Sequence, residues 1–110
     1  MAAIVSREAD LTDSLGRKIK IRKLKPSDRM KLSLALGDAA KNEMFLGHAF
    51  LAATVTEIDG EKVFAPSNRM EAEILCDRLD DEGLEAVGLA YAELFGDKPM
   101  GDAEIEAAKN

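Results

Sequence analysis

The amino-acid sequence predicts a mainly α-helical protein, a small domain of about four helices with an N-terminal β-hairpin. It also predicts a short β-turn between the second and third helices. Residues 44–56 contain no Lys, Arg, Asp or Glu in a chain that is 33% charged, and such a helix is normally buried by its neighbours. The flanking segments 26–36, 68–79 and 84–95 each carry an apolar stripe that can cover it.

The length of 110 residues leaves room for one domain. We expect a helical domain with its hairpin over residues 1–96, and a loop and mobile C-terminal tail over 97–110. The single cysteine, Cys76, excludes an intramolecular disulfide and is typical of a reducing compartment. No signal-peptide pattern or apolar run of about 20 residues is present, so we expect a soluble, cytoplasmic protein with no membrane partner.

Residues 17–24 alternate apolar and basic side chains, which predicts a half-buried strand. Together with the turn residues at 13–16, they predict a hairpin that pairs residues 5–13 with 17–24. Five basic residues lie in this strand or close to its end: Lys18, Lys20, Arg22, Lys23 and Lys25. They either discourage edge-to-edge pairing of the sheet or form a docking surface for an acidic partner.

The charge is distributed unevenly along the chain. Residues 1–56 hold ten Lys or Arg and six Asp or Glu, a net +4, whereas residues 57–110 hold five and fifteen, a net −10. The two halves either neutralise each other within the fold or recruit an oppositely charged partner or a second copy. The overall charge of −6 argues against general nucleic-acid binding, because phosphate contacts favour positive charge.

Local signals set the boundaries of the predicted helices. Pro26 suits a first helical position and Gly37 a helix end. Asp59-Gly60 predicts a small β-turn or mini-hairpin after the uncharged helix. Asn68 has capping-box spacing to the acid three residues later. The acids at 80–82 and the glycine after them are expected to separate the last two helices.

The sequence contains no pattern for catalysis or metal binding. His48 and Cys76 are the only residues of their types, so no zinc motif exists, and His48 is expected at the core edge or an interface. The acids match helix N-termini better than a hydrolase pair, and no phosphate-binding loop is present. We therefore expect a non-enzymatic protein with no cofactor, no metal and no nucleic-acid partner.

Three segments resemble tail assembly chaperones of long-tailed bacteriophages and prophages, and the likeness extends over about residues 12–95. They are DSLGRKIKIRKLKPSDRM at 13–30, LGHAFLAATVTEIDG at 46–60 and DRLDDEGLEAV at 77–87. The resemblance implies a helical protein of the bacterial host cytoplasm that is absent from the mature virion. It implies binding to the tape measure protein, help for tail tube polymerisation, and self-association into a homo-oligomer.

Two other functions remain open beside the chaperone. One is a structural minor tail or tail completion protein of the particle, and the weaker one is a small enzyme. For the chaperone we predict partner contacts through Lys18, Lys20, Arg22, Lys23, Lys25, Phe45 and Phe50. Any side of the helix 44–56 that its neighbours leave uncovered is the first place to expect a client or a second copy, because amphipathic helices commonly bind in apolar grooves.

Overall fold

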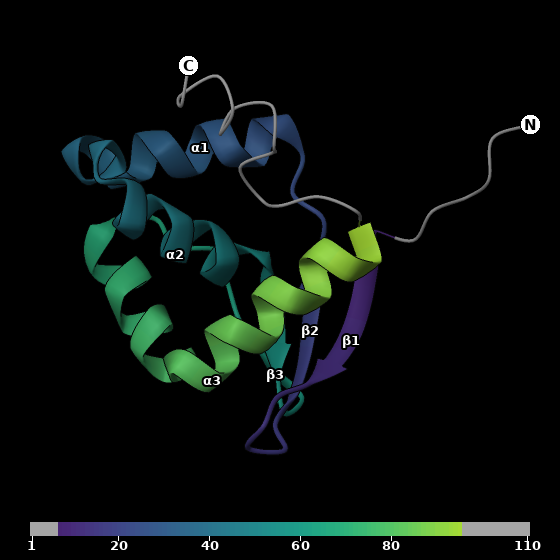
Figure 1. The fold of residues 1–110 in the computed structure, drawn as a ribbon. Coiled ribbons are helices and arrows are strands. Elements are labelled where there is room, and N and C mark those ends of the chain that lie inside the picture. The colour runs from purple at the N-terminus through teal and green to yellow at the C-terminus, as the bar shows by residue number, and fades with distance from the viewer. Residues whose placement is uncertain (1–6, 96–110) are drawn as a thin grey trace, which may run out of the picture.

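The computed structural model describes residues 7–95 (Figure 1). The elements in chain order are β1 (Glu8–Thr12), β2 (Lys18–Arg22), α1 (Pro26–Leu36), a 3₁₀ helix (Gly37–Lys41), α2 (Glu43–Thr54), β3 (Val55–Ile58), β4 (Glu61–Lys62) and α3 (Arg69–Phe95). The predicted tail at 97–110 and the first residues of the predicted hairpin lie outside the described part.

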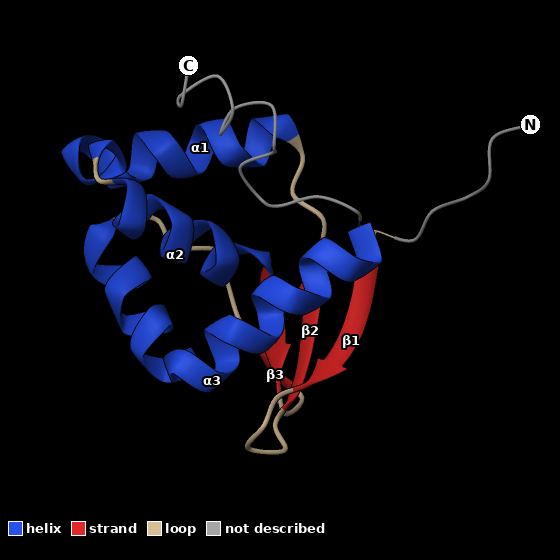
Figure 2. Ribbon diagram, in the orientation of Figure 1, coloured by secondary structure: helices blue, strands red, loops and turns tan. Residues whose placement is uncertain are grey.

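The fold is α/β, and the prediction of a mainly α protein was wrong in this respect. The four strands form one antiparallel sheet in the order β1-β2-β3-β4 (Figure 2). The predicted hairpin is present as β1 and β2, with Glu8 opposite Arg22 and Thr12 opposite Lys18. The segment predicted as a small β-turn or mini-hairpin forms the β3–β4 hairpin, and β3 also pairs with β2. A two-stranded hairpin alone is only marginally stable in water. The pairing of β2 with β3 joins the two hairpins into one four-stranded sheet.

The turn at Asp59-Gly60 has the geometry that its sequence predicts. Asp59 has φ 50° and Gly60 has φ 83°, the pair of positive values that a two-residue hairpin turn of type I′ requires. Because β3 begins at Val55, α2 ends two residues before the predicted limit at 56. The basic strand β2 is an inner strand, so the interpretation that its charges protect a sheet edge was wrong.

The two helices predicted at 68–79 and 84–95 form a single kinked helix, α3, so residues 7–95 contain three α-helices. Asp80 lies at the kink with φ 63° and ψ 179°, a conformation that is essentially restricted to glycine. Its carboxylate accepts the N–H of Asp81 at 2.9 Å. The acidic segment predicted to break the helix therefore turns α3 into two limbs, which run in different directions in Figure 1.

Two apolar clusters hold these elements together. The second limb of α3 lies across β1 and β2 (Figure 1). One cluster joins the sheet to α3 and includes Ile19, Ile21, Ala52, Val55, Ile58, Leu75, Leu79, Leu84, Val87 and Tyr91. The other joins α1, α2 and the first limb of α3 and includes Leu24, Leu32, Leu36, Ala49, Phe50, Ala53 and Ala72. The first limb of α3 thus packs against α2 in both clusters.

Candidate functional site

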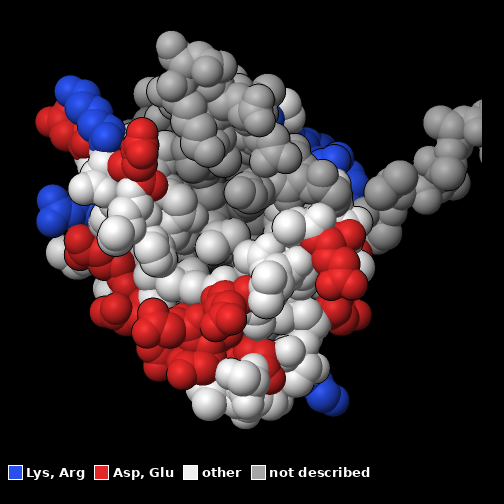
Figure 3. Space-filling view, in the orientation of Figure 1, with Lys and Arg blue, Asp and Glu red and all other residues white. Residues whose placement is uncertain are grey.

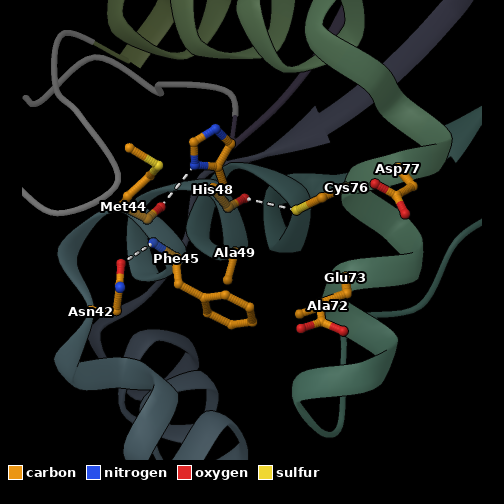
Figure 4. A pocket seen from close by; sticks show the side chains of 9 residues that line it. All are labelled: Asn42, Met44, Phe45, His48, Ala49, Ala72, Glu73, Cys76 and Asp77. Atoms are coloured by element: carbon orange, nitrogen blue, oxygen red, sulfur yellow. Dashed lines mark hydrogen bonds between the residues drawn. The ribbon is translucent and has the colours of Figure 1, made fainter.

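An open groove of about 510 Å³ separates the N-terminal half of α2 from the first limb of α3 (Figure 4). Its lining residues are Asn42, Met44, Phe45, His48, Ala49, Ala72, Glu73, Cys76 and Asp77. In Figure 4 the lining residues of α2 lie on one side of the groove and those of α3 on the other. Mainly apolar and aromatic residues form the α2 side, and acids appear on the α3 side.

The groove exists because α2 is buried over only part of its length. The prediction of an all-round buried helix is confirmed for its C-terminal half, where Ala49, Phe50 and residues 52–54 are buried. Residues 7–95 cover its N-terminal half only in part, since Phe45 is half-buried and Met44 is 74% exposed. Asn42 starts the helix here, since its side-chain oxygen accepts the N–H of Phe45 at 3.0 Å, as an N-cap residue does.

His48 and Cys76 lie in the groove, and both are held by backbone carbonyls. Nδ1 of His48 donates to the carbonyl of Met44 at 2.7 Å. The thiol of Cys76 donates weakly to the carbonyl of His48 at 3.6 Å. Burial, together with the charge of Asp77, raises the pKa of the Cys76 thiol. A thiol with a raised pKa is a poor nucleophile at neutral pH.

The α3 wall of the groove is acidic. Glu73 and Asp77 are one helical turn apart on α3 and both line the groove. Arg69 reaches Glu73 at 3.1 Å in an exposed ion pair, whereas Asp77 makes no ion pair with any residue in the range 7–95. Figure 3 shows acidic side chains gathered over α3 beside an uncharged surface.

The predicted basic residues lie elsewhere, on and beside the sheet. Lys18, Lys20 and Arg22 alternate along β2 with the buried isoleucines and point to the opposite face. Lys20 is opposite Asp10 and Glu57 in the sheet register, and its ammonium group is 3.6 Å from the Glu57 carboxylate.

The remaining basic residues are also near backbone or acidic groups. The guanidinium of Arg22 is 2.8 Å from the Asp28 carboxylate. Lys23 donates its backbone N–H to Arg7 at 2.7 Å, and Lys25 is the N-cap residue of α1. Of the five predicted basic residues, Lys20 and Arg22 therefore form ion pairs within residues 7–95, and only the Lys20 pair joins the two halves of the chain.

Of the two predicted aromatic contacts, the structure places only one at the groove. Phe45 is half-buried and lines it. Phe50 is 6% exposed and belongs to the core cluster with Leu32 and Leu36, so it has almost no surface to offer a partner. Sequence reasoning did not identify Glu73 and Asp77 as site residues, because nothing in the order of the chain shows that their helix borders α2.

The described residues contain no group of three or more His, Cys, Asp or Glu side chains arranged to hold a metal ion. No helix in that part of the chain is long and apolar enough to cross a membrane. Comparison with protein-family models, curated proteins and solved structures finds no match.

Proposed function

We propose that this protein is a non-enzymatic tail assembly chaperone of a bacteriophage or prophage, working in the host cytoplasm and absent from the mature virion. Its client is the tape measure protein, and it assists the tail tube protein to polymerise around that client. The sequence resemblance over residues 13–30, 46–60 and 77–87 supports this assignment. The observation that carries it is the open groove between α2 and α3.

The groove has the properties that a helix-binding chaperone requires. An amphipathic client helix aggregates through its apolar face, and a groove of apolar side chains removes that face from water. The flexible side chain of Met44 forms one wall, and such side chains adapt to different client sequences. Phe45 and Ala49 extend this surface along α2. Of the residues predicted to bind partners, this proposal relies on Phe45, since Lys20 and Arg22 already have acidic neighbours.

Co-expression with the tape measure protein tests the proposal. The wild-type protein should keep the tape measure protein in the soluble fraction, and Met44→Glu should return much of it to the pellet. Met30→Glu is the matched control, because Met30 is also a helical methionine, is 67% exposed and lies on α1 outside the groove. A tape measure protein that stays insoluble with the wild-type chain, or an equal effect of both variants, would contradict the proposal.

The particle itself separates the chaperone from a structural tail protein. Mass spectrometry of purified mature particles should find the tape measure and tail tube proteins but not this chain. A stoichiometric amount of this chain in the particle would replace the chaperone assignment with that of a minor tail or tail completion protein.

A further inference from the structure

We infer that the groove selects helices that carry Lys or Arg beside their apolar stripe, on the side that faces α3. The inference rests on the proposed function only in taking the groove as a binding site for a helix. It adds a chemical requirement for the client, namely positive charges at a defined spacing. The requirement follows from the position of the acids on α3 relative to the apolar surface of α2.

The two walls of the groove differ in charge. Met44, Phe45 and Ala49 on α2 carry no charge, whereas Glu73 and Asp77 are the charged residues of the lining and both are acidic. The whole of α3 contains eight Asp or Glu and two Arg. A helix lying in the groove therefore has an apolar neighbour on one side and a negative one on the other (Figure 4).

The spacing of the acids sets the spacing of the complementary charges. Glu73 and Asp77 are four residues apart, so their positions differ by about 6 Å along the axis of α3. Basic residues three or four positions apart on a helix lie on one face at the same separation. A client helix that runs along α3 can pair two such residues with Glu73 and Asp77. Asp77 forms no ion pair with residues 7–95, so pairing there breaks none, whereas pairing with Glu73 competes with its exposed ion pair to Arg69 at 3.1 Å.

Segments of this chain fit the requirement less well than a basic client helix. Residues 97–110 contain four Asp or Glu and two Lys, so their charge has the same sign as the groove wall. On α1, the exposed Met30 and Leu34 have Arg29 and Lys31 as neighbours, but the helix also contains Asp28 and has a net charge of only +1. We therefore assign the groove to a partner helix, and self-association through α1 is an outcome that the experiment can detect.

Cys76 makes the test direct, because it is the only cysteine of the chain and lines the groove. Two helical peptides of about 18 residues, roughly five turns, share one leucine stripe and differ only in flanking residues, Lys in one and Glu in the other. At low salt and mildly alkaline pH, the rate of Cys76 alkylation by iodoacetamide is measured in the full chain. At a Lys-peptide concentration of ten times Kd, we expect that rate to fall about tenfold. The Glu peptide should leave it unchanged.

A pair of charge-reversal variants tests whether the groove acids are responsible. In the double variant Glu73→Lys with Asp77→Lys, the Glu peptide should slow Cys76 alkylation and the Lys peptide should not. Asp81→Lys with Glu85→Lys makes the same change in net charge at two exposed positions on the second limb of α3. This control should keep the preference for the Lys peptide, because neither Asp81 nor Glu85 lines the groove. Equal protection by both peptides, or reversal by the control pair, would overturn the inference.

The remaining outcomes separate this inference from the proposed function. A Lys preference in a protein that does not keep the tape measure protein soluble would support the groove chemistry and refute the chaperone assignment. Solubilisation of the tape measure protein without any charge preference would support the chaperone assignment and refute the groove chemistry. If alkylation slows as the protein alone is concentrated, and Met30→Glu abolishes that slowing, a second copy occupies the groove and the inference is wrong.

Discussion

Arg17 and Asp13 form an ion pair that connects the β-hairpin turn to the kink of α3. Nε of Arg17 donates to Oδ2 of Asp13 at 2.7 Å. The same guanidinium donates from Nη1 to the carbonyl of Arg78 at 2.8 Å and from Nη2 to the carbonyl of Leu79. These carbonyls lie at the end of the first limb. Because the helix is kinked at Asp80, they lack the N–H donors that a further helical turn would supply. Arg17 therefore caps the limb that forms one wall of the groove.

Replacing Arg17 should destabilise the protein strongly. Arg17→Ala leaves the buried carboxylate of Asp13 without its cation and the two carbonyls without their donor, so we expect a loss of about 2–3 kcal/mol in the free energy of unfolding. Arg78→Ala is the control, because its pair with Glu61 at 2.8 Å is exposed and such pairs contribute about 0–1 kcal/mol. Urea denaturation measures both, and similar losses for the two variants would contradict the capping role.

Asp13 and Asp28 should make the fold sensitive to acid. Burial acts to raise the pKa of Asp13, but hydrogen bonds from Arg17 and Leu15 outweigh it and the pKa is lowered from 3.8. Hydrogen bonds from the side chain of Arg22 and the backbone of Lys25 lower the pKa of Asp28.

The sign of the pH dependence follows from these lowered values. Both carboxylates stabilise the fold above the unfolded pKa of 3.8, and this contribution is lost as the pH falls through the lower, folded values. The urea midpoint should therefore drop steeply below about pH 4. Asp28→Asn should have a lower midpoint than the wild type at pH 7 and a smaller change between pH 7 and pH 3. An unchanged acid dependence in that variant would contradict the role of Asp28.

Gly83 should not tolerate a side chain. A Cβ at this position would lie 3.0 Å from Cβ of Leu79 and 3.1 Å from Nη2 of Arg17, so Gly83→Ala should destabilise the fold by about 1–3 kcal/mol. Gly88 is the matched control in the same limb, because its Cβ would be 3.6 Å from Leu51, an ordinary contact. Gly88→Ala should be neutral or stabilise by up to about 1 kcal/mol. Thermal and urea denaturation measure the stability of both variants. Equal changes in stability would refute the crowding at Gly83.

Tyr91 should contribute through its hydroxyl group as well as its ring. The hydroxyl accepts the backbone N–H of Leu24 at 3.2 Å in the core, and the ring meets Phe95 edge-on at 4.9 Å between centroids. Tyr91→Phe keeps the ring but leaves the N–H of Leu24 buried without a partner, at a cost of about 1–3 kcal/mol. Amide hydrogen exchange at Leu24 should accelerate in this variant. Unchanged exchange and stability would show that this hydrogen bond contributes nothing.

Features that depend on neighbouring residues could be predicted from the sequence. Pro26 begins α1, Asn68 accepts the N–H of Glu71 at 2.9 Å near the start of α3, and Asp59-Gly60 forms the turn. In one detail the capping differs, because the Glu71 side chain accepts the N–H of Ser67. Each of these features depends on backbone groups only a few residues away.

Features that depend on distant segments could not be predicted. The pairing of Ile19 with Ile58 joins segments 39 positions apart and makes one sheet of two hairpins. The groove depends on how much of α2 is covered by α1 and α3, which the uncharged composition of residues 44–56 does not specify. Its position was predicted only as the uncovered side of that helix, and the acids of α3 became part of it through packing.

The rate of Cys76 alkylation in the complex with the tape measure protein tests the central claim most directly. The complex is purified from co-expressing cells, its stoichiometry is determined, and iodoacetamide labelling of Cys76 is compared with that of the free chain. If the groove holds the client helix, labelling in the complex should be slower by about tenfold or more, since only the unbound fraction reacts. The same rate in a stoichiometric complex and in the free chain would show that the client binds elsewhere.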